Sequence, residues 1–277
     1  MGWKAYRVVL RLLAPLHVGA GQVGNVQRAR PYLTGKALWG ALTARLARDG
    51  AGMQGDYVRA GRWVNEALAF SYFYPAVGPQ VDVWPWGDTA DEFAWRYLDS
   101  YCATALSHDR NAAQDASLHE VEFVAPYARD GRPVYLVGYI IERQPGEVPW
   151  RQALSRVRLG GERGYGWGRV ALAGQPLAEE ALFGRYVMAS DAARPVLRAE
   201  GSARSPLLAH TLACDGRAGK GVVAQGTIEP FVGRETADAG RFGNQCSAAV
   251  VCWAPGATVE GGTRLAVASY GLWEAAG

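Results

Sequence analysis

The residues best suited to chemistry in this 277-residue chain lie between positions 156 and 170, where arginine and aromatic side chains are interspersed with glycine. Glycine loses more entropy on folding than any other residue, so a dense run is costly unless the backbone needs positive φ or close approach. Arginine pairs with phosphate and aromatic rings stack on bases, which favours contact with single-stranded nucleic acid. The candidate binding residues here are Gly160, Gly161, Arg163, Gly164, Tyr165, Gly166, Trp167, Gly168 and Arg169. A glycine-rich hairpin tip that binds nothing is the simpler alternative.

The N-terminal part of the chain is strongly basic, although the net charge of the whole chain is only +3. No acidic residue precedes Asp49, whereas eight lysines and arginines do. A run of one sign creates a local field that attracts phosphate groups. Arg28, Arg30 and Lys36 are therefore candidate phosphate-binding residues on the same RNA segment.

His17 is the one histidine whose position suggests catalysis. It follows a predicted strand and precedes a glycine-rich loop, with basic residues nearby in sequence. A general base for metal-independent cleavage of RNA needs a group that titrates near neutral pH and cations for the phosphate. A histidine that ends a strand and hydrogen-bonds locally is the alternative, because no orienting partner is visible in the sequence.

Two glycine motifs in the same region are not nucleotide sites. Residues 19–24 fit G-x-G-x-x-G, but the polar segment that follows ends in Pro31 and does not open a helix. Residues 34–37 resemble the end of a phosphate-binding P-loop, but Ala37 replaces the magnesium-binding hydroxyl. We expect no cofactor.

Composition predicts a soluble, globular chain, with 49% apolar and 20% charged residues. No apolar run is long enough to span a bilayer, so we expect no membrane association. The four cysteines show neither metal-ligand spacing nor a disulfide pattern. We therefore expect no metal site and a reducing, cytoplasmic environment.

Periodicity predicts an α+β fold in two parts. Residues 1–175 follow the order strand, helix, two strands, helix, strand, which is that of a ferredoxin-like domain of the RNA-recognition-motif type with insertions. The predicted helices cover 35–48 (capped by Thr34), 63–70, 89–106 (capped by Thr89) and 150–156, and the predicted strands cover 6–13, 71–77, 118–125, 134–141 and 169–173. The strands at 118–125 and 134–141 would pair as a hairpin, and residues 17–31 would form a flexible loop.

Residues 176–277 form the second part, which is predicted to be rich in strands. A linker at 174–180 would join it to the first. The candidate strands are 185–189, 207–214, 221–231, 247–255 and 264–270.

Three ordered features resemble the RAMP superfamily, the RNA-binding subunits of CRISPR–Cas complexes. They are the strand ending in PLHVG (15–19), the entry to the first helix RPYLTGKALWGAL (30–42), and the late glycine-rich loop LGGERGYGWG (159–168). The resemblance covers about residues 4–50 and 150–172 well and the C-terminal third loosely. Within the superfamily the chain looks most like the type III subunit that caps the crRNA 5′ handle.

The resemblance implies a non-catalytic subunit that holds the guide handle and contacts other CRISPR effector subunits in a prokaryotic cytoplasm. The segment GTIEPFVGR (226–234) and the strands after it are similar to that subunit's degenerate, ferredoxin-like second half. The target-cutting backbone subunit is expected to carry an aspartate after the first strand, and this chain has none between Pro15 and Pro31. We therefore expect no cleavage of target RNA.

Two alternatives remain open at the level of sequence. One is a metal-independent endoribonuclease that processes CRISPR repeats with His17. The other is a β-rich binding module that recognises no RNA.

Overall fold

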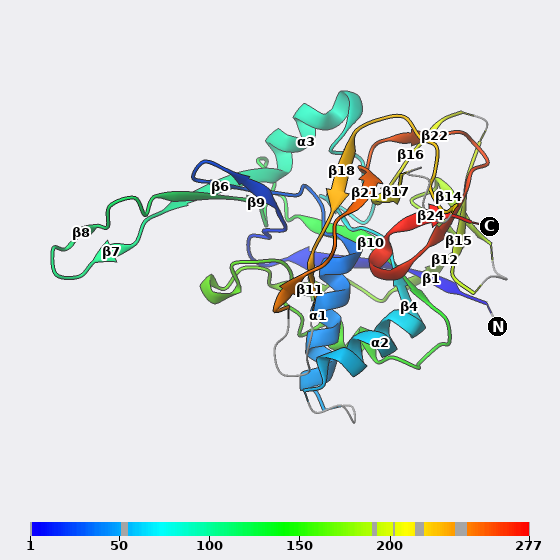
Figure 1. The fold of residues 1–277 in the computed structure, drawn as a ribbon, viewed down its shortest axis with the longest axis horizontal. Helices are drawn as coiled ribbons and strands as arrows, with labels where there is room; N and C mark the ends of the chain where they lie inside the picture. Colours follow the sequence, from blue (N-terminus) through cyan, green and yellow to red (C-terminus); the bar gives the residue numbers. More distant parts are fainter. Residues whose placement is uncertain are drawn as a thin grey trace.

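An antiparallel sheet with the strand order β11-β1-β10-β4 organises the first half of the chain (Figure 1). The computed structural model describes residues 2–50, 55–189, 193–201, 203–213, 219–235 and 243–276. Two more strands extend the sheet, because β5 pairs with β10 and β12 pairs with β1. The strands are β1 (Lys4–Leu12), β4 (Leu68–Phe70), β5 (Tyr74–Ala76), β10 (Tyr135–Glu142), β11 (Val170–Leu172) and β12 (Leu177–Glu179).

Three helices accompany this sheet: α1 (Gly35–Arg48), α2 (Tyr57–Ala67) and α4 (Trp150–Leu154). Helix α1 has the predicted bounds and the predicted cap, since the Thr34 hydroxyl accepts a hydrogen bond from the Ala37 amide at 3.2 Å. Its leucines recur every four positions, and Leu38, Leu42 and Leu46 are all buried. Helix α2 begins earlier than the sequence predicted.

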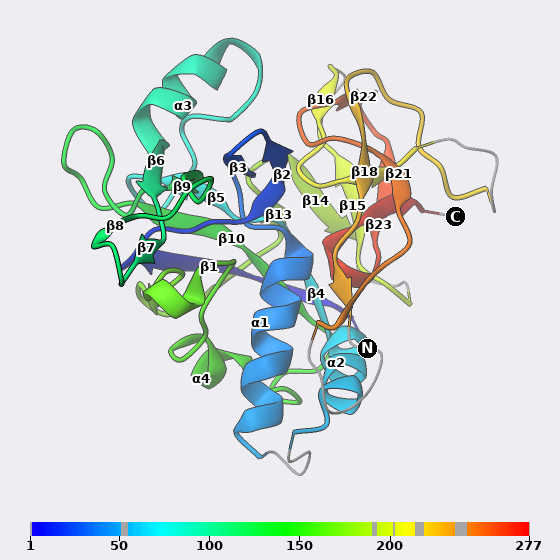
Figure 2. The same cartoon turned by 60° about the vertical axis from the view of Figure 1, so that its left-hand side comes forward.

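The alternation along β1 separates two cores, because successive strand residues point to opposite faces. Even-numbered residues such as Val8 and Leu10 pack with helices α1 and α4. Trp3 and Ala5 point the other way and pack with the second half of the chain. Figure 2 shows α1, α2 and α4 on one side of β1 and β10, with the strands of the second half beside them.

The predicted flexible loop at 17–31 is instead a β-hairpin, which corrects the sequence interpretation. Strands β2 (Gly19–Val23) and β3 (Val26–Ala29) pair across a turn in which Gly24 has a φ of +58°. Strand β3 also runs parallel to β9 (His119–Val124), which pairs with β6 (Leu98–Ala103). The hairpin is ordered by this distant partner, so the local sequence did not reveal it.

Two further predictions in the insertion are wrong. Helix α3 covers only Ala90–Tyr97, and most of the predicted continuation to residue 106 is strand β6, which ends at Ala103. Strands β9 and β10 lie in different sheets and do not form a hairpin with each other. Every residue of β6 is half-exposed or exposed, so this strand lacks the one-sided burial pattern that identifies a strand in a sequence.

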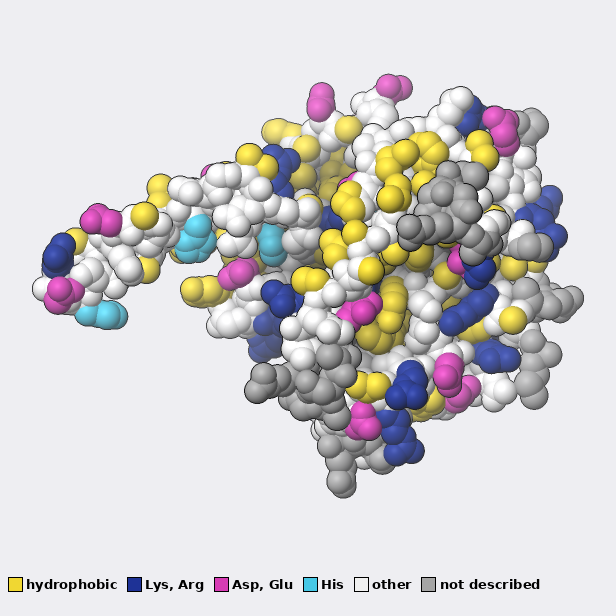
Figure 3. Space-filling model, in the orientation of Figure 1, with side chains coloured by type: hydrophobic (Ala, Val, Ile, Leu, Met, Phe, Trp, Pro, Cys, Tyr) yellow, Lys and Arg dark blue, Asp and Glu magenta, His cyan; other side chains and the backbone are white. Residues whose placement is uncertain are grey.

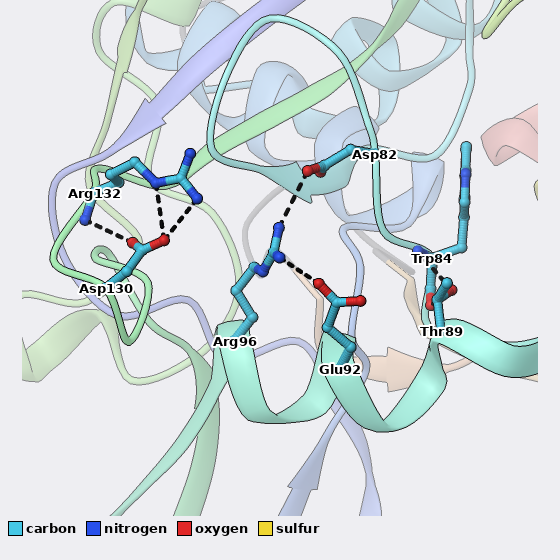
Figure 4. A network of polar contacts seen from close by, with 7 residues as sticks. All are labelled: Asp82, Trp84, Thr89, Glu92, Arg96, Asp130 and Arg132. Carbon is cyan, nitrogen blue, oxygen red and sulfur yellow. Dashed lines mark hydrogen bonds and ion pairs between the residues drawn. The ribbon is translucent and has the colours of Figure 1, made fainter.

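Thr89 does not cap α3. Its hydroxyl donates to the Trp84 carbonyl at 2.9 Å and accepts from the Trp84 amide at 3.2 Å (Figure 4). The acidic residues Asp91 and Glu92 lie in the first turn of α3, and Glu92 and Asp82 both pair with Arg96 (Figure 4).

Strands β6 and β9 form a long arm that leaves the body of the molecule (Figure 1). The short strands β7 (Leu106–Ser107) and β8 (Ala112–Ala113) extend the arm, and charged side chains gather at its end (Figure 3). No helix in the described ranges is long and apolar enough to cross a membrane.

The second half is rich in strands, as predicted. Its eight-stranded sheet has the order β13-β14-β15-β23-β24-β17-β21-β18. These strands are β13 (Ala181–Leu182), β14 (Tyr186–Ala189), β15 (Val196–Ala199), β17 (Thr211–Leu212), β18 (Ile228–Phe231), β21 (Val250–Trp253), β23 (Arg264–Val267) and β24 (Trp273–Ala275). The predicted end of one strand at Cys214 lies outside the described residues. The described part of this half contains no α-helix, so the helices of a ferredoxin-like half are missing from it.

The predicted linker at 174–180 is not a free connection. Strand β12 pairs with β1 in the first sheet, with Leu177 opposite Arg7 and Glu179 opposite Ala5. The two halves are therefore joined by backbone hydrogen bonds as well as by a shared apolar core.

Candidate nucleic-acid interface

A cavity of about 470 Å³ lies where the glycine-rich loop, helix α1 and the second half of the chain meet. Six of the thirteen residues predicted from the sequence as RNA-binding or catalytic line this cavity: His17, Arg30, Lys36, Gly160, Gly161 and Arg163. The folded chain thus brings the first basic segment and the glycine-rich loop to one place. Gly164, Tyr165, Gly166, Trp167, Gly168, Arg169 and Arg28 are not among the lining residues.

The glycine-rich loop is fastened to the segment that follows β1. The Gly161 amide donates to the His17 carbonyl at 2.8 Å, and the Gly168 amide donates to the Pro15 carbonyl at 2.8 Å. Gly160 and Gly168 both have positive φ, at +71° and +73°. A β-carbon on Gly160 would lie 2.2 Å from the His17 carbonyl oxygen, so the close approach that glycine permits here is within the chain itself.

We expect Gly168→Ala to destabilise the protein by about 3 kcal/mol, because the new methyl group meets backbone and positive φ strains an L-residue. The added β-carbon would lie 1.8 Å from the Leu159 carbonyl oxygen. Denaturant unfolding of the purified chain measures the change. Gly164→Ala is the matched control, since open space surrounds Gly164 and only a small change is expected there. Equal unfolding midpoints for the two variants would contradict the assigned loop geometry.

His17 is 7% exposed and has an orienting partner that the sequence did not show. Its Nδ1 lies 2.7 Å from the Glu122 carbonyl oxygen on β9. A carbonyl only accepts, so Nδ1 donates and the neutral ring carries its lone pair on Nε2. Because His17 lines the cavity, that nitrogen is suited to accept a proton or a hydrogen bond there.

The three predicted phosphate ligands of the N-terminal segment all have carboxylate partners. Arg28 Nε lies 2.8 Å from Glu122 Oε2, away from the cavity. Arg30, which lines the cavity, pairs with Glu229 behind the lining at 3.0 Å. Lys36 pairs with Glu235 at 3.2 Å and lies 4.8 Å from the centre of the Tyr270 ring. Residues of the second half therefore balance the charge of both inner cations.

A buried chain of hydrogen bonds holds Arg30 in place. The Tyr72 hydroxyl donates to His210 Nδ1 at 2.6 Å, and His210 Nε2 donates to Glu229. The bond from His210, helped by Arg30, lowers the pKa of Glu229 from its ordinary 4.5 to about 2. Burial lowers the pKa of His210, so a neutral imidazole faces an ionised carboxylate and an arginine. This network connects both halves of the chain.

Among the described residues that line the cavity, three arginines have no carboxylate partner. Arg158 and Arg163 line the cavity, are exposed, and form no ion pair with any described residue. Arg234 is exposed and donates to the Gly243 carbonyl at 3.4 Å. Arg158 and Arg234 were missed as site residues, although both belong to segments that the sequence had singled out. Only the packing of the second half against the loop brings them together.

The two aromatic residues of the loop differ in availability. Tyr165 is 80% exposed and free to stack on a base. Trp167 is half-buried and packs edge-on against Phe123, with ring centres 5.0 Å apart. Arg169 is exposed beside the cavity. Tyr165 is therefore the better stacking candidate.

Structural comparison identifies the class of fold. The sequence matches no protein-family model and none of the curated proteins. A chain of the type III-B Cmr-beta complex, solved by cryo-electron microscopy with cognate target RNA and AMPPnP, superposes with a TM-score of 0.55. That match covers 92% of this chain and 86% of the other at 11% identity. At this identity the likeness shows the fold.

Two other Cmr-beta matches are weaker. A chain from the complex with cognate target RNA has a TM-score of 0.42 at 12% identity, covering 61% of this chain and 96% of the other. A chain from the apo state has a TM-score of 0.40 at 10% identity, with the same coverage.

Proposed function

We propose that this chain is a non-catalytic crRNA-binding subunit of a type III-like CRISPR effector ribonucleoprotein. It would hold the 5′ handle of the guide RNA, contact neighbouring effector subunits and work in a prokaryotic cytoplasm. The cavity carries the proposal: it is lined by several cations and by no acidic residue in the part of the chain that the structure describes. The fold shared with a Cmr-beta chain supports the same assignment.

The fold itself supports a division into two parts. We propose that residues 1–175 are a ferredoxin-like, RNA-recognition-motif-type domain, because the antiparallel order β11-β1-β10-β4 and the alternation of strands and helices are those of that fold. Residues 176–277 would form the second part, which closes one side of the cavity through Phe231 and Arg234.

The RNA would bind along the rim of the cavity. Arg158, Arg163 and Arg234 would pair with phosphates, and Tyr165 would stack on a base. Backbone amide groups and glycines at the loop surface allow the RNA backbone to come close, above all at Gly164 and Gly166, which have open space around them. Arg30 and Lys36 would act at longer range, because Glu229 and Glu235 pair with them.

The decisive experiment mixes the purified chain with labelled CRISPR-repeat RNA in EDTA and compares native with denaturing gels. We expect a retarded complex on the native gel and intact RNA on the denaturing gel. Absence of any complex at low salt would reject RNA binding and favour a β-rich module for another ligand.

A second candidate function rests on the orientation of His17. The bond to the Glu122 carbonyl leaves Nε2 as the basic nitrogen of the neutral ring at a cation-lined cavity. This arrangement suits a metal-independent endoribonuclease that processes CRISPR repeats. Discrete cleavage in EDTA that is abolished in His17→Ala and retained in His108→Ala would establish it. Intact RNA after prolonged incubation with the wild-type chain would exclude it.

A further inference from the structure

A second cavity, of about 300 Å³, lies on the face of the first sheet that points away from α1 and α4. Its floor comes from the two central strands, where Arg7 of β1 is directly opposite Tyr139 of β10. The loop at 79–84 and the turn between β13 and β14 form its walls. It shares no lining residue with the cavity described above.

This face is the one on which four-stranded sheets of the RNA-recognition type stack bases, using side chains of the two central strands. In this chain the second half covers part of the face, where Trp3 and Ile141 are buried against it. The cavity is the corner that stays open. Its volume is at the small end of ligand pockets, a size suited to one planar group.

Aromatic rings line this corner. Phe183 lies edge-on to Tyr139 at 4.9 Å and to Trp84 at 5.6 Å between ring centres. Trp84 is held from behind, since its ring stacks on Trp86 at 5.1 Å and its backbone is bound by Thr89 (Figure 4). These contacts fix the orientation of the aromatic rings at the wall of the cavity.

Phe183, whose ring lines the cavity, has a strained backbone conformation. Phe183 and Gly184 have φ values of +53° and +61°, in a turn closed by the Arg185 amide and the Leu182 carbonyl at 3.0 Å. Such a turn favours glycine, asparagine and aspartate, and a bulky residue at positive φ is rare. Strain of this kind concentrates at ligand-binding sites, so the aromatic side chain points to a function beyond the turn.

A carboxylate and a guanidinium mark the polar end of the cavity. Arg7 Nε lies 2.9 Å from Glu179 Oε1, and the Tyr139 hydroxyl donates to Glu179 Oε2 at 2.8 Å. Each carboxylate oxygen accepts two hydrogen bonds, so each keeps one acceptor position. Arg7 also keeps N–H groups beyond those bound to Glu179 and to the Pro79 carbonyl.

We propose that this cavity binds a nucleobase, and that guanine is the base it favours. The Watson–Crick edge of guanine has two adjacent donors, N1–H and the N2 amino group, beside the acceptor O6. Glu179 would accept from the two donors and Arg7 would donate to O6, while Phe183 and Trp84 enclose the ring. No other standard base has two adjacent donors on that edge. The guanidinium of Arg185 lies 5.6 Å from the Trp84 ring centre and would pair with a phosphate attached to the base.

Isothermal titration with GMP, AMP, CMP and UMP tests the proposal on the intact chain. We expect GMP to bind about tenfold tighter than the other three, as a bidentate contact confers. Phe183→Asn tolerates the turn but removes the ring, and it should weaken GMP binding about tenfold or more. Glu179→Gln should remove the preference for guanine. Glu180→Gln, on the neighbouring exposed residue, is the matched control and should bind as wild type.

No saturable GMP binding, or GMP binding that neither variant changes, would overturn the proposal. Equal binding of all four nucleotides would overturn the assignment of guanine. The source of the base is tested with a short oligouridylate with and without one internal guanosine. Tighter binding of the guanosine-containing RNA, lost in Phe183→Asn, indicates a base within RNA, and no difference indicates a free nucleotide. If the first cavity does not bind RNA, the oligouridylate without guanosine will not bind the wild-type chain. The two proposals can therefore fail independently.

Discussion

Replacing Arg158, Arg163 and Arg234 together by alanine is expected to weaken binding of CRISPR-repeat RNA about 100-fold at low salt. The physical reason is that these are the cations of the first cavity that no carboxylate neutralises among the described residues. An exposed contact between a cation and an anion contributes up to about 1 kcal/mol, and three such contacts give a change of this size. Fluorescence anisotropy with labelled RNA measures the loss.

The salt dependence of binding distinguishes lost phosphate contacts from misfolding. Each phosphate contact with single-stranded RNA contributes roughly 0.7 to the slope of log affinity against log salt, so the triple variant should lose about 2. The matched control removes three exposed arginines that do not line either cavity, Arg59, Arg62 and Arg198. A triple variant with the wild-type slope would show that the RNA binds elsewhere.

Glu229→Ala is expected to destabilise the folded chain by about 3 kcal/mol. The variant removes the acceptor of both Arg30 and His210; His210 is fully buried, and the Arg30 side chain is only 14% exposed. Breaking a buried ion pair from one side is costly because the remaining charge is left without a partner. Thermal or denaturant unfolding provides the measurement. Glu260→Ala is the control, because Glu260 is 76% exposed and forms only a surface pair, so its removal should change stability little.

The same network predicts how stability depends on pH. The pKa of Glu229 is lowered in the folded chain from 4.5 to about 2, so its contribution is complete above pH 4.5 and is lost as the pH falls towards 2. Burial also lowers the pKa of His210 below 6.5, so folding stability decreases further as the pH falls below 6.5. Stability should therefore rise with pH across this range. In Glu229→Gln, stability should depend less on pH between pH 4.5 and 2. If stability fell with pH in this range as it does in the wild type, the network would be contradicted.

The sequence by itself determined the elements whose causes are local. Helix α1 has its predicted bounds because Thr34 caps it and leucines recur at helical spacing, both of which act within a few residues. The alternation along β1 likewise separates its two faces without reference to any partner strand. The glycine-rich loop was singled out from composition, and Gly160, Gly161 and Arg163 do lie at the cavity.

Only the tertiary structure decided the pairing of strands and the identity of the free cations. Strand β9 was predicted to pair with β10 but pairs with β6 and β3, because sheet partners far apart in sequence leave little trace in local periodicity. Arg30 and Lys36 are predicted phosphate ligands, and the sequence did not reveal that each pairs with a carboxylate of the second half, Glu229 and Glu235. Charge balance in a cavity depends on which distant segments fold together, and that is set by packing of the whole chain.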